Sequence, residues 1–241
     1  MTSRTVYLIL GLYPFLNLFV PDPVTLRWIL KHGGAPMPAE VKENGERVHR
    51  TFSVLTYCFL ALAVSYCLKR SSVPASLIGL HLKEPAKFML YGVLTGFAIL
   101  GWQFTFERIL PVKSSYPGTH FTAKGSARLW VLRFLLGSFV EELWRAFCIV
   151  GLIKTGRSVT SALLITSFVF GIGHLNAGLR GARIGFTLGI IIRFVSLGVV
   201  YGVLFLWTSS ILSPCTAHFL KNTLSMFSSR HASATARPFS F

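Results

Sequence analysis

The chain is short of charge, and above all of negative charge. Of its 241 residues only 13% are charged, and eight acidic residues stand against 24 lysines and arginines. A soluble domain carries roughly a quarter charged residues, so this composition excludes an ordinary water-exposed globule. Hydrophobic residues make up 52% of the sequence and the mean hydropathy is +0.59, which is typical of a membrane protein.

Cysteine is scarce as well, with four residues in the whole chain. Cys58 and Cys67 lie about 13 Å apart along one predicted helix, which is too far for a disulfide bond. Cys148 and Cys215 fall in apolar segments, and neither spacing is typical of a metal site. A His-Glu-x-x-His helix is also missing. The sequence therefore indicates neither a disulfide framework nor the usual helix of a zinc protease.

Long apolar stretches are what the chain does contain. A bilayer-spanning helix needs roughly 20 apolar residues, and lipid offers the backbone no partners outside a helix or a closed barrel. The sequence therefore predicts an all-α, polytopic transmembrane bundle of about six to eight helices. The polar segment 21–50 is expected to form a loop with a short interfacial helix. The predicted spans are 6–20, 51–68, 88–106, 129–153, 159–174, 184–207 and 211–227.

The net charge of +16 lies mostly between these spans. Basic loops favour contact with anionic lipid, so we expect the bilayer, with anionic lipids, to be a partner. Because basic residues occur on nearly every loop, they do not decide the orientation. Nucleic acid is not expected as a partner, since no soluble domain presents a basic face.

Two adjacent glutamates, Glu141 and Glu142, lie inside the apolar stretch 135–150, with Arg145 close behind. A charge at bilayer depth costs several kcal/mol, so such residues usually have a function. On a helix, Arg145 shares a face with Glu141 at i+4 and with Glu142 at i+3. It can neutralise one carboxylate and leave the other for proton transfer. An ion pair that only fixes helix packing is the alternative.

Two later segments contribute further polar groups. His174 ends the fifth predicted span, and His218 and Asn222 share a helix face in the seventh. Imidazole suits proton transfer near neutral pH, and an imidazole with an amide offers donors for a developing oxyanion. Taken singly, each group is explained equally well as a packing hydrogen bond. Together, a carboxylate, an imidazole and an amide on three helices indicate hydrolysis by activated water.

These three clusters, in this order, resemble the three motifs of the CAAX prenyl protease type II family, also called CAAX protease and bacteriocin-processing (CPBP) proteins, which are intramembrane proteases. The resemblance covers residues 129–222. The matching residues are Glu141, Glu142 and Arg145, then Phe170 and His174, then His218 and Asn222.

The resemblance implies an intramembrane endopeptidase that cuts a peptide bond of a membrane-associated protein or peptide, prenylated or otherwise lipid-anchored. The implied base is Glu141, assisted by His174, which activates a water molecule. His218 and Asn222 are implied to stabilise the oxyanion. The second glutamate and the arginine of the first motif are implied to orient the base.

The first motif departs from the family pattern. The family places three residues between its second glutamate and the arginine, whereas only Leu143 and Trp144 intervene here. Glu141 matches a motif glutamate whichever residue is aligned, so we favour it as the base. The shortened motif leaves open a family member that has lost catalysis and serves as a membrane interaction or immunity protein. A proton-coupled transporter is less favoured, since the sequence lacks two corresponding halves.

Catalysis without a metal is the preferred mechanism. Zinc is the alternative, held by Glu141, His174 and His218 as two imidazoles and one carboxylate with an open position. We expect an integral, multi-pass protein, in the plasma membrane if the source is bacterial. We also expect one integrated membrane domain. Its parts are N-terminal helices and interfacial loops at 1–128, the protease-like core at 129–227, and a basic, disordered tail at 228–241.

Overall fold

The structure is a computed structural model that describes residues 2–19, 31–32, 38–71, 73–81, 83–109, 127–174 and 184–235. Over these residues it is helical and has no strand, which confirms the predicted all-α class. Each of the seven predicted apolar segments overlaps one α-helix. The helices are α1 (Ser3–Phe19), α3 (Ala39–Ser71), the short 3-10 helix η1 (Ala75–Ile78), α4 (Pro85–Ile109), α5 (Ala127–Lys154), α6 (Val159–Gly173), α8 (Ile184–Thr208) and α9 (Leu212–Thr235).

Two of these helices are longer than their apolar segments. α3 begins at Ala39 and has 33 residues, so residues 39–50, which were expected in a loop, belong to it. α9 continues through Thr235, so residues 228–235 are helical and the expected disordered tail does not begin at 228. Residues 236–241 of that tail lie outside the described residues. The charged side chains of 39–50 are good helix formers, which explains how α3 continues beyond its apolar part.

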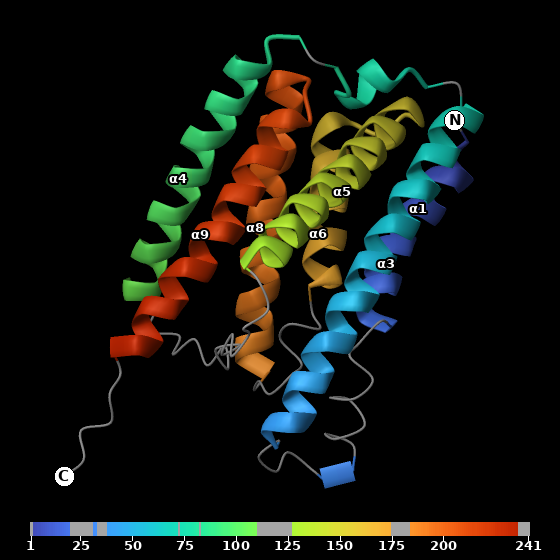
Figure 1. Cartoon of the computed structure of the whole chain (residues 1–241). Helices are drawn as coiled ribbons and strands as arrows, with labels where there is room; N and C mark the ends of the chain where they lie inside the picture. The colour runs from blue at the N-terminus through green and yellow to red at the C-terminus, as the bar shows by residue number, and fades with distance from the viewer. Residues whose placement is uncertain are drawn as a thin grey trace, which may run out of the picture.

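α5 lies at the centre of the bundle (Figure 1). It packs against α1, α3, α6, α8 and α9, and all of residues 140–149 are buried. A helix that is covered on every side belongs to the core of a bundle. The glutamates on α5 are therefore enclosed by protein and do not face lipid.

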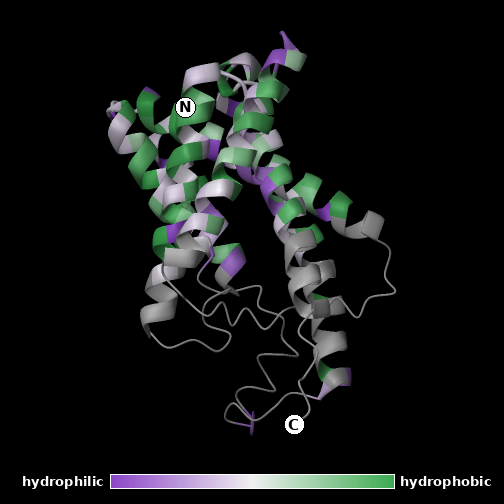
Figure 2. Cartoon of the chain, turned by 90° about the vertical axis from the view of Figure 1, so that its left-hand side faces the viewer, coloured by the Kyte–Doolittle hydropathy of each residue, from purple (hydrophilic) through white to green (hydrophobic). Residues whose placement is uncertain are grey.

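α4 lies at the edge of the bundle and packs mainly against α9 (Figure 1). A Cβ atom at Gly92 would lie 2.5 Å from the backbone oxygen of Ser213, so glycine is what allows the two helices to approach. The opposite face of α4 exposes large apolar side chains, and Figure 2, which views this side of the molecule, shows hydrophobic residues along the helices. Such a surface is typical of contact with lipid. The exposed residues are Met89, Leu90, Leu94, Phe97, Trp102 and Phe104.

Three stretches within the described helices are long and apolar enough to cross a bilayer, namely Ser53–Ser71, Pro85–Thr105 and Ile191–Thr208. They lie in α3, α4 and α8. α6 is apolar but has only 15 residues, so it is about 22 Å long and shorter than the hydrocarbon core of about 30 Å. These helices identify a membrane protein.

Candidate functional site

The centre of the site is a buried cluster that joins α5 to α9. α5 contributes Glu141, Glu142 and Arg145, and α9 contributes His218. Glu142 accepts a hydrogen bond from Arg145 through Oε2, and its Oε1 lies 2.8 Å from Nδ1 of His218. Both oxygens of Glu142 are therefore occupied, one by each helix.

The contact with Glu142 determines which ring nitrogen of His218 carries the proton. A carboxylate only accepts hydrogen bonds, so Nδ1 of His218 carries the proton and a neutral ring presents the lone pair of Nε2. This Nε2 lies 3.7 Å from Oε2 of Glu141. Tyr201 stacks on the imidazole with ring centroids 4.8 Å apart and an interplanar angle of 17°. The ring is held with its free nitrogen toward Glu141.

Glu141 is engaged differently from its neighbour. Its Oε1 accepts a hydrogen bond of 3.1 Å from the hydroxyl of Tyr57, on α3. Its Oε2 faces His218. Arg145 forms its ion pair with Glu142, three residues back, and so neutralises that carboxylate. Glu141 is left as the carboxylate with an oxygen directed at a basic nitrogen.

Arg145 is enclosed by aromatic rings. Its Cζ lies 4.2 Å from the centroid of Phe170 and 5.4 Å from that of Tyr201, at distances typical of cation–π contacts. A Cβ atom at Gly202 of α8 would come within 2.4 Å of Leu163 and 3.8 Å of Cδ of Arg145. The missing side chain at 202 therefore leaves room for Leu163 of α6, next to the aliphatic part of Arg145.

His174 lies beside the cluster, and its hydrogen bond is made within its own helix. It caps the C-terminus of α6, its Nδ1 lies 2.9 Å from the carbonyl oxygen of Phe170, and its ring stacks on Phe194 with centroids 3.9 Å apart. The ring of Phe170 contacts both histidines, with its centroid 4.4 Å from that of His174 and 6.1 Å from that of His218. Phe170 thus connects His174 to the histidine that faces Glu141.

Asn222 lies one turn beyond His218 on α9 and is half-buried. Its Oδ1 accepts a hydrogen bond of 3.2 Å from Nζ of Lys221. This leaves the amide nitrogen of Asn222 as its remaining donor group. Of the six predicted site residues, direct contacts unite Glu141, Glu142, Arg145 and His218, while His174 and Asn222 lie at the edge.

The zinc site considered from the sequence does not form in this arrangement. Among the described residues, no group of three or more His, Cys, Asp and Glu side chains is placed to hold a metal ion. His174 is turned to its own helix and to Phe194, while Glu141 is bonded to Tyr57. The three candidate ligands therefore do not fit zinc as placed here.

Two residues of the site were missed from the sequence, namely Tyr57 and Tyr201. Both are tyrosines inside predicted spans, where a phenol hydroxyl needs a partner when it is buried. A tyrosine inside a predicted span was therefore a signal that the sequence offered. The sequence did not indicate which helix faces each tyrosine.

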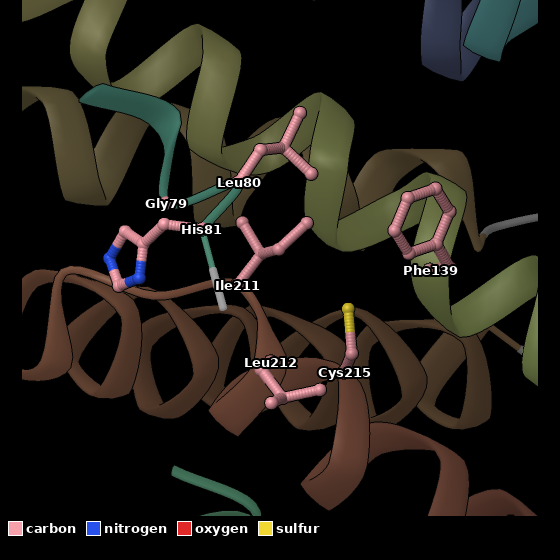
Figure 3. A pocket seen from close by; sticks show the side chains of 7 residues that line it. All are labelled: Gly79, Leu80, His81, Phe139, Ile211, Leu212 and Cys215. Carbon is pink, nitrogen blue, oxygen red and sulfur yellow. The ribbon is translucent and has the colours of Figure 1, made fainter. Parts of the chain in front are cut away.

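An apolar hollow of about 330 Å³ is lined by residues of α5, of α9 and of the segment after η1 (Figure 3). Phe139 precedes Glu142 by three residues and Cys215 precedes His218 by three, so the hollow lies one helical turn from both. Figure 3 shows these side chains around the same space, together with the chain segment after η1. The lining residues are Gly79, Leu80, His81, Phe139, Ile211, Leu212 and Cys215.

Comparison with known proteins found one family. Residues 123–224 match the family model described as type II CAAX prenyl endopeptidase Rce1-like. No curated protein and no solved structure matches the chain. The matched residues contain α5, α6, α8 and the first half of α9, and hence all six predicted site residues. Over residues 123–224, the chain is therefore similar to the Rce1-like family of type II CAAX prenyl endopeptidases.

Proposed function

We propose that the chain is an intramembrane endopeptidase that hydrolyses a peptide bond of a membrane-associated protein or peptide with a water molecule activated by Glu141. The observation that carries the proposal is the unequal engagement of the two buried glutamates. Glu142 is occupied at both oxygens by Arg145 and His218, whereas Glu141 keeps Oε2 directed at Nε2 of His218. The family match supports peptide-bond hydrolysis as the reaction class.

In the proposed reaction, a water molecule gives one hydrogen bond to Oε2 of Glu141 and the other to Nε2 of His218. Glu141 takes a proton as the water oxygen attacks the peptide carbonyl carbon. The tetrahedral intermediate then collapses, the carbon–nitrogen bond breaks, and the leaving amine receives the proton from Glu141. Glu142 holds the tautomer and orientation of His218, as the aspartate does in a Ser-His-Asp triad.

The tautomer of His218 favours a different role from the one that the family resemblance implies. A neutral ring with its proton on Nδ1 accepts at Nε2 and therefore orients the water, whereas an oxyanion needs a donor. Asn222 is the better oxyanion partner, because Lys221 occupies its Oδ1 and leaves its amide N–H groups available. His174 is left as an outer participant, whose ring contacts Phe170 and Phe194.

The apolar hollow supports a substrate with an apolar group close to the scissile bond. Its lining is almost entirely hydrophobic, and it lies one turn from Glu142 and His218. A prenyl group, another lipid anchor or an aliphatic side chain would fit there. We place the protein as a multi-pass membrane protein, in the plasma membrane if the source is bacterial, with anionic lipid against its basic loops.

The test is a comparison of the termini of membrane proteins by mass spectrometry. Cells express equal amounts of the wild type, of Glu141→Gln, or of Glu84→Gln, which alters an exposed glutamate. We expect new termini with the wild type and with Glu84→Gln, and none with Glu141→Gln. The same termini in all three strains, with folded protein in each, would contradict peptide-bond hydrolysis by Glu141.

A second candidate function is a membrane interaction protein of this family without catalysis. It is favoured by the first motif, which is one residue short, and by the packing of His174 against Phe194. Such a protein would keep its partner in Glu141→Gln. Capture of the same partner by the wild type and by this variant, together with unchanged termini, would support it.

A further inference from the structure

The site receives a hydrogen bond from a part of the chain that the family match does not cover. Tyr57 lies on α3, outside residues 123–224, and its hydroxyl donates to Oε1 of Glu141. We propose that Tyr57 is a positioning residue, which holds Glu141 by one carboxylate oxygen so that the other faces His218. The proposal assigns the N-terminal half of the chain a direct part in the site.

A second hydrogen bond joins α3 to α5. About one turn earlier on α3 and two turns earlier on α5, Nη2 of Arg133 on α5 donates to Oγ of Ser53 on α3, at 3.1 Å. The two hydrogen-bonding residues of α3 are four residues apart, and the two of α5 are eight residues apart. On each helix the two residues therefore lie on one face. The two helices run in parallel here, and their register places Tyr57 opposite Glu141.

Gly137 leaves the space in which the phenol ring of Tyr57 packs against α5. It lies four residues before Glu141 on α5, hence on the same face. A Cβ atom at this position would lie 3.1 Å from Cε2, Cζ and the hydroxyl oxygen of Tyr57. That is closer than most packed carbon atoms allow, so the ring fits against α5 because residue 137 has no side chain.

The orientation of Glu141 follows from which of its oxygens is held. A hydrogen bond to an ionised carboxylate is stronger than one between neutral groups. With Oε1 bonded to Tyr57, Oε2 is the oxygen left for water and His218. Without the hydroxyl, the side chain loses this restraint and samples other rotamers, which a near-attack geometry does not tolerate. The effect on turnover rests on the proposed function, whereas the hydrogen bond itself does not.

The first test reads the carboxyl group directly. Infrared spectroscopy of the purified protein in lipid follows the carboxyl band that disappears in Glu141→Gln. Tyr57→Phe keeps the ring and removes the hydroxyl, and Tyr66→Phe, on the exposed face of the same helix, is the matched control. We expect the band frequency to change in Tyr57→Phe, because the carboxyl group has lost a hydrogen-bond donor, and to stay the same in Tyr66→Phe. An unchanged band frequency in Tyr57→Phe would overturn the proposal.

The second test measures turnover with a substrate identified from the termini comparison. Tyr57→Phe is expected to lower kcat roughly tenfold, near the lower end of the effect of losing a hydrogen bond to a charged group, with KM unchanged. Gly137→Ala, which crowds the ring, should lower kcat in the same way, and Tyr66→Phe should not. An active wild type with the same kcat in Tyr57→Phe would overturn the positioning role. A changed infrared band in a protein that cleaves nothing would support the positioning of Glu141 and contradict the peptidase.

Discussion

Two ion pairs of the same spacing show how much burial matters at a single residue. Glu142 and Arg145 are i,i+3 partners whose side chains are each 1% exposed, while Lys87 and Glu84 are i,i+3 partners at 52% and 61% exposure. Glu142→Gln leaves the guanidinium of Arg145 buried without its counter-charge. We expect this change to lower the free energy of unfolding by about 3–5 kcal/mol. The measurement is unfolding of the purified protein in detergent.

Glu84→Gln is the control for that experiment. It removes a charge at the same sequence spacing, but the pair is exposed and contributes about 0–1 kcal/mol. Equal losses of stability in the two variants would mean that the Glu142–Arg145 pair is not buried as described. A stability loss confined to Glu142→Gln would confirm its structural part in the site.

At the scale of residues, the sequence predicted the site residues on α5 and α9 but not the one on α3. The rarity of acidic residues and the helical spacing singled out Glu141, Glu142, Arg145 and His218, and these four meet in the structure. Tyr57 was not predicted, because its role depends on the register between two helices that are distant in the sequence. Periodicity describes one helix at a time and does not determine which faces meet.

At the scale of the helices, glycine decides how closely α8 approaches α6. A Cβ atom at Gly198 would lie 2.9 Å from Cα of Ser167, which is backbone and has little room to move. Gly198→Ala is therefore expected to destabilise the protein by about 1–3 kcal/mol through overpacking. Thermal unfolding monitored by tryptophan fluorescence measures the change.

Gly189 offers a matched control on the same helix. Outside its own helix, no atom of the described residues lies within 4 Å of a Cβ atom built there, so Gly189→Ala should be neutral or stabilising by up to about 1 kcal/mol through helix propensity. Destabilisation by Gly189→Ala as large as by Gly198→Ala would contradict the assignment of the loss at Gly198 to its contact with α6.

The helices themselves were predictable, and their ends were less so. Long apolar stretches located all seven, because each must bury or place in lipid a continuous hydrophobic surface. Hydropathy placed the start of α3 near residue 51, whereas the helix begins at Ala39. The intervening residues are charged, and hydropathy does not distinguish a solvated helix from a solvated loop. For the same reason, the helical residues 228–235 were expected to be a disordered tail.

At the scale of the whole molecule, the parallel packing of α3 and α5 predicts a membrane topology. The C-terminal ends of these helices lie at the same end of the bundle (Figure 1). Single cysteines placed at Ser76, after α3, and at Arg157, after α5, should therefore react with a membrane-impermeant reagent from one side. A cysteine at Glu40, before the apolar part of α3, should react from the other.

These cysteines are introduced into a variant in which the four natural cysteines are replaced, because Cys58 is exposed. Reagent added to intact cells and to inverted vesicles gives opposite patterns for the two sides. Labelling of Arg157→Cys together with Glu40→Cys from one side would contradict the crossing of the membrane by both helices and with it the multi-pass proposal.

The short helix α6 has a consequence for the surrounding lipid. It exposes Leu164 and Phe168 to the outside of the bundle, yet at about 22 Å it is shorter than the hydrocarbon layer that it meets. A bilayer adapts to such a mismatch by thinning locally. We therefore expect the acyl chains beside α6 to be compressed, with headgroups and their water nearer to His174 at the end of this helix than in a bilayer of full thickness. In the proposed hydrolysis, such a depression of the membrane surface would bring water, one of the two reactants, close to a site that is otherwise enclosed by protein.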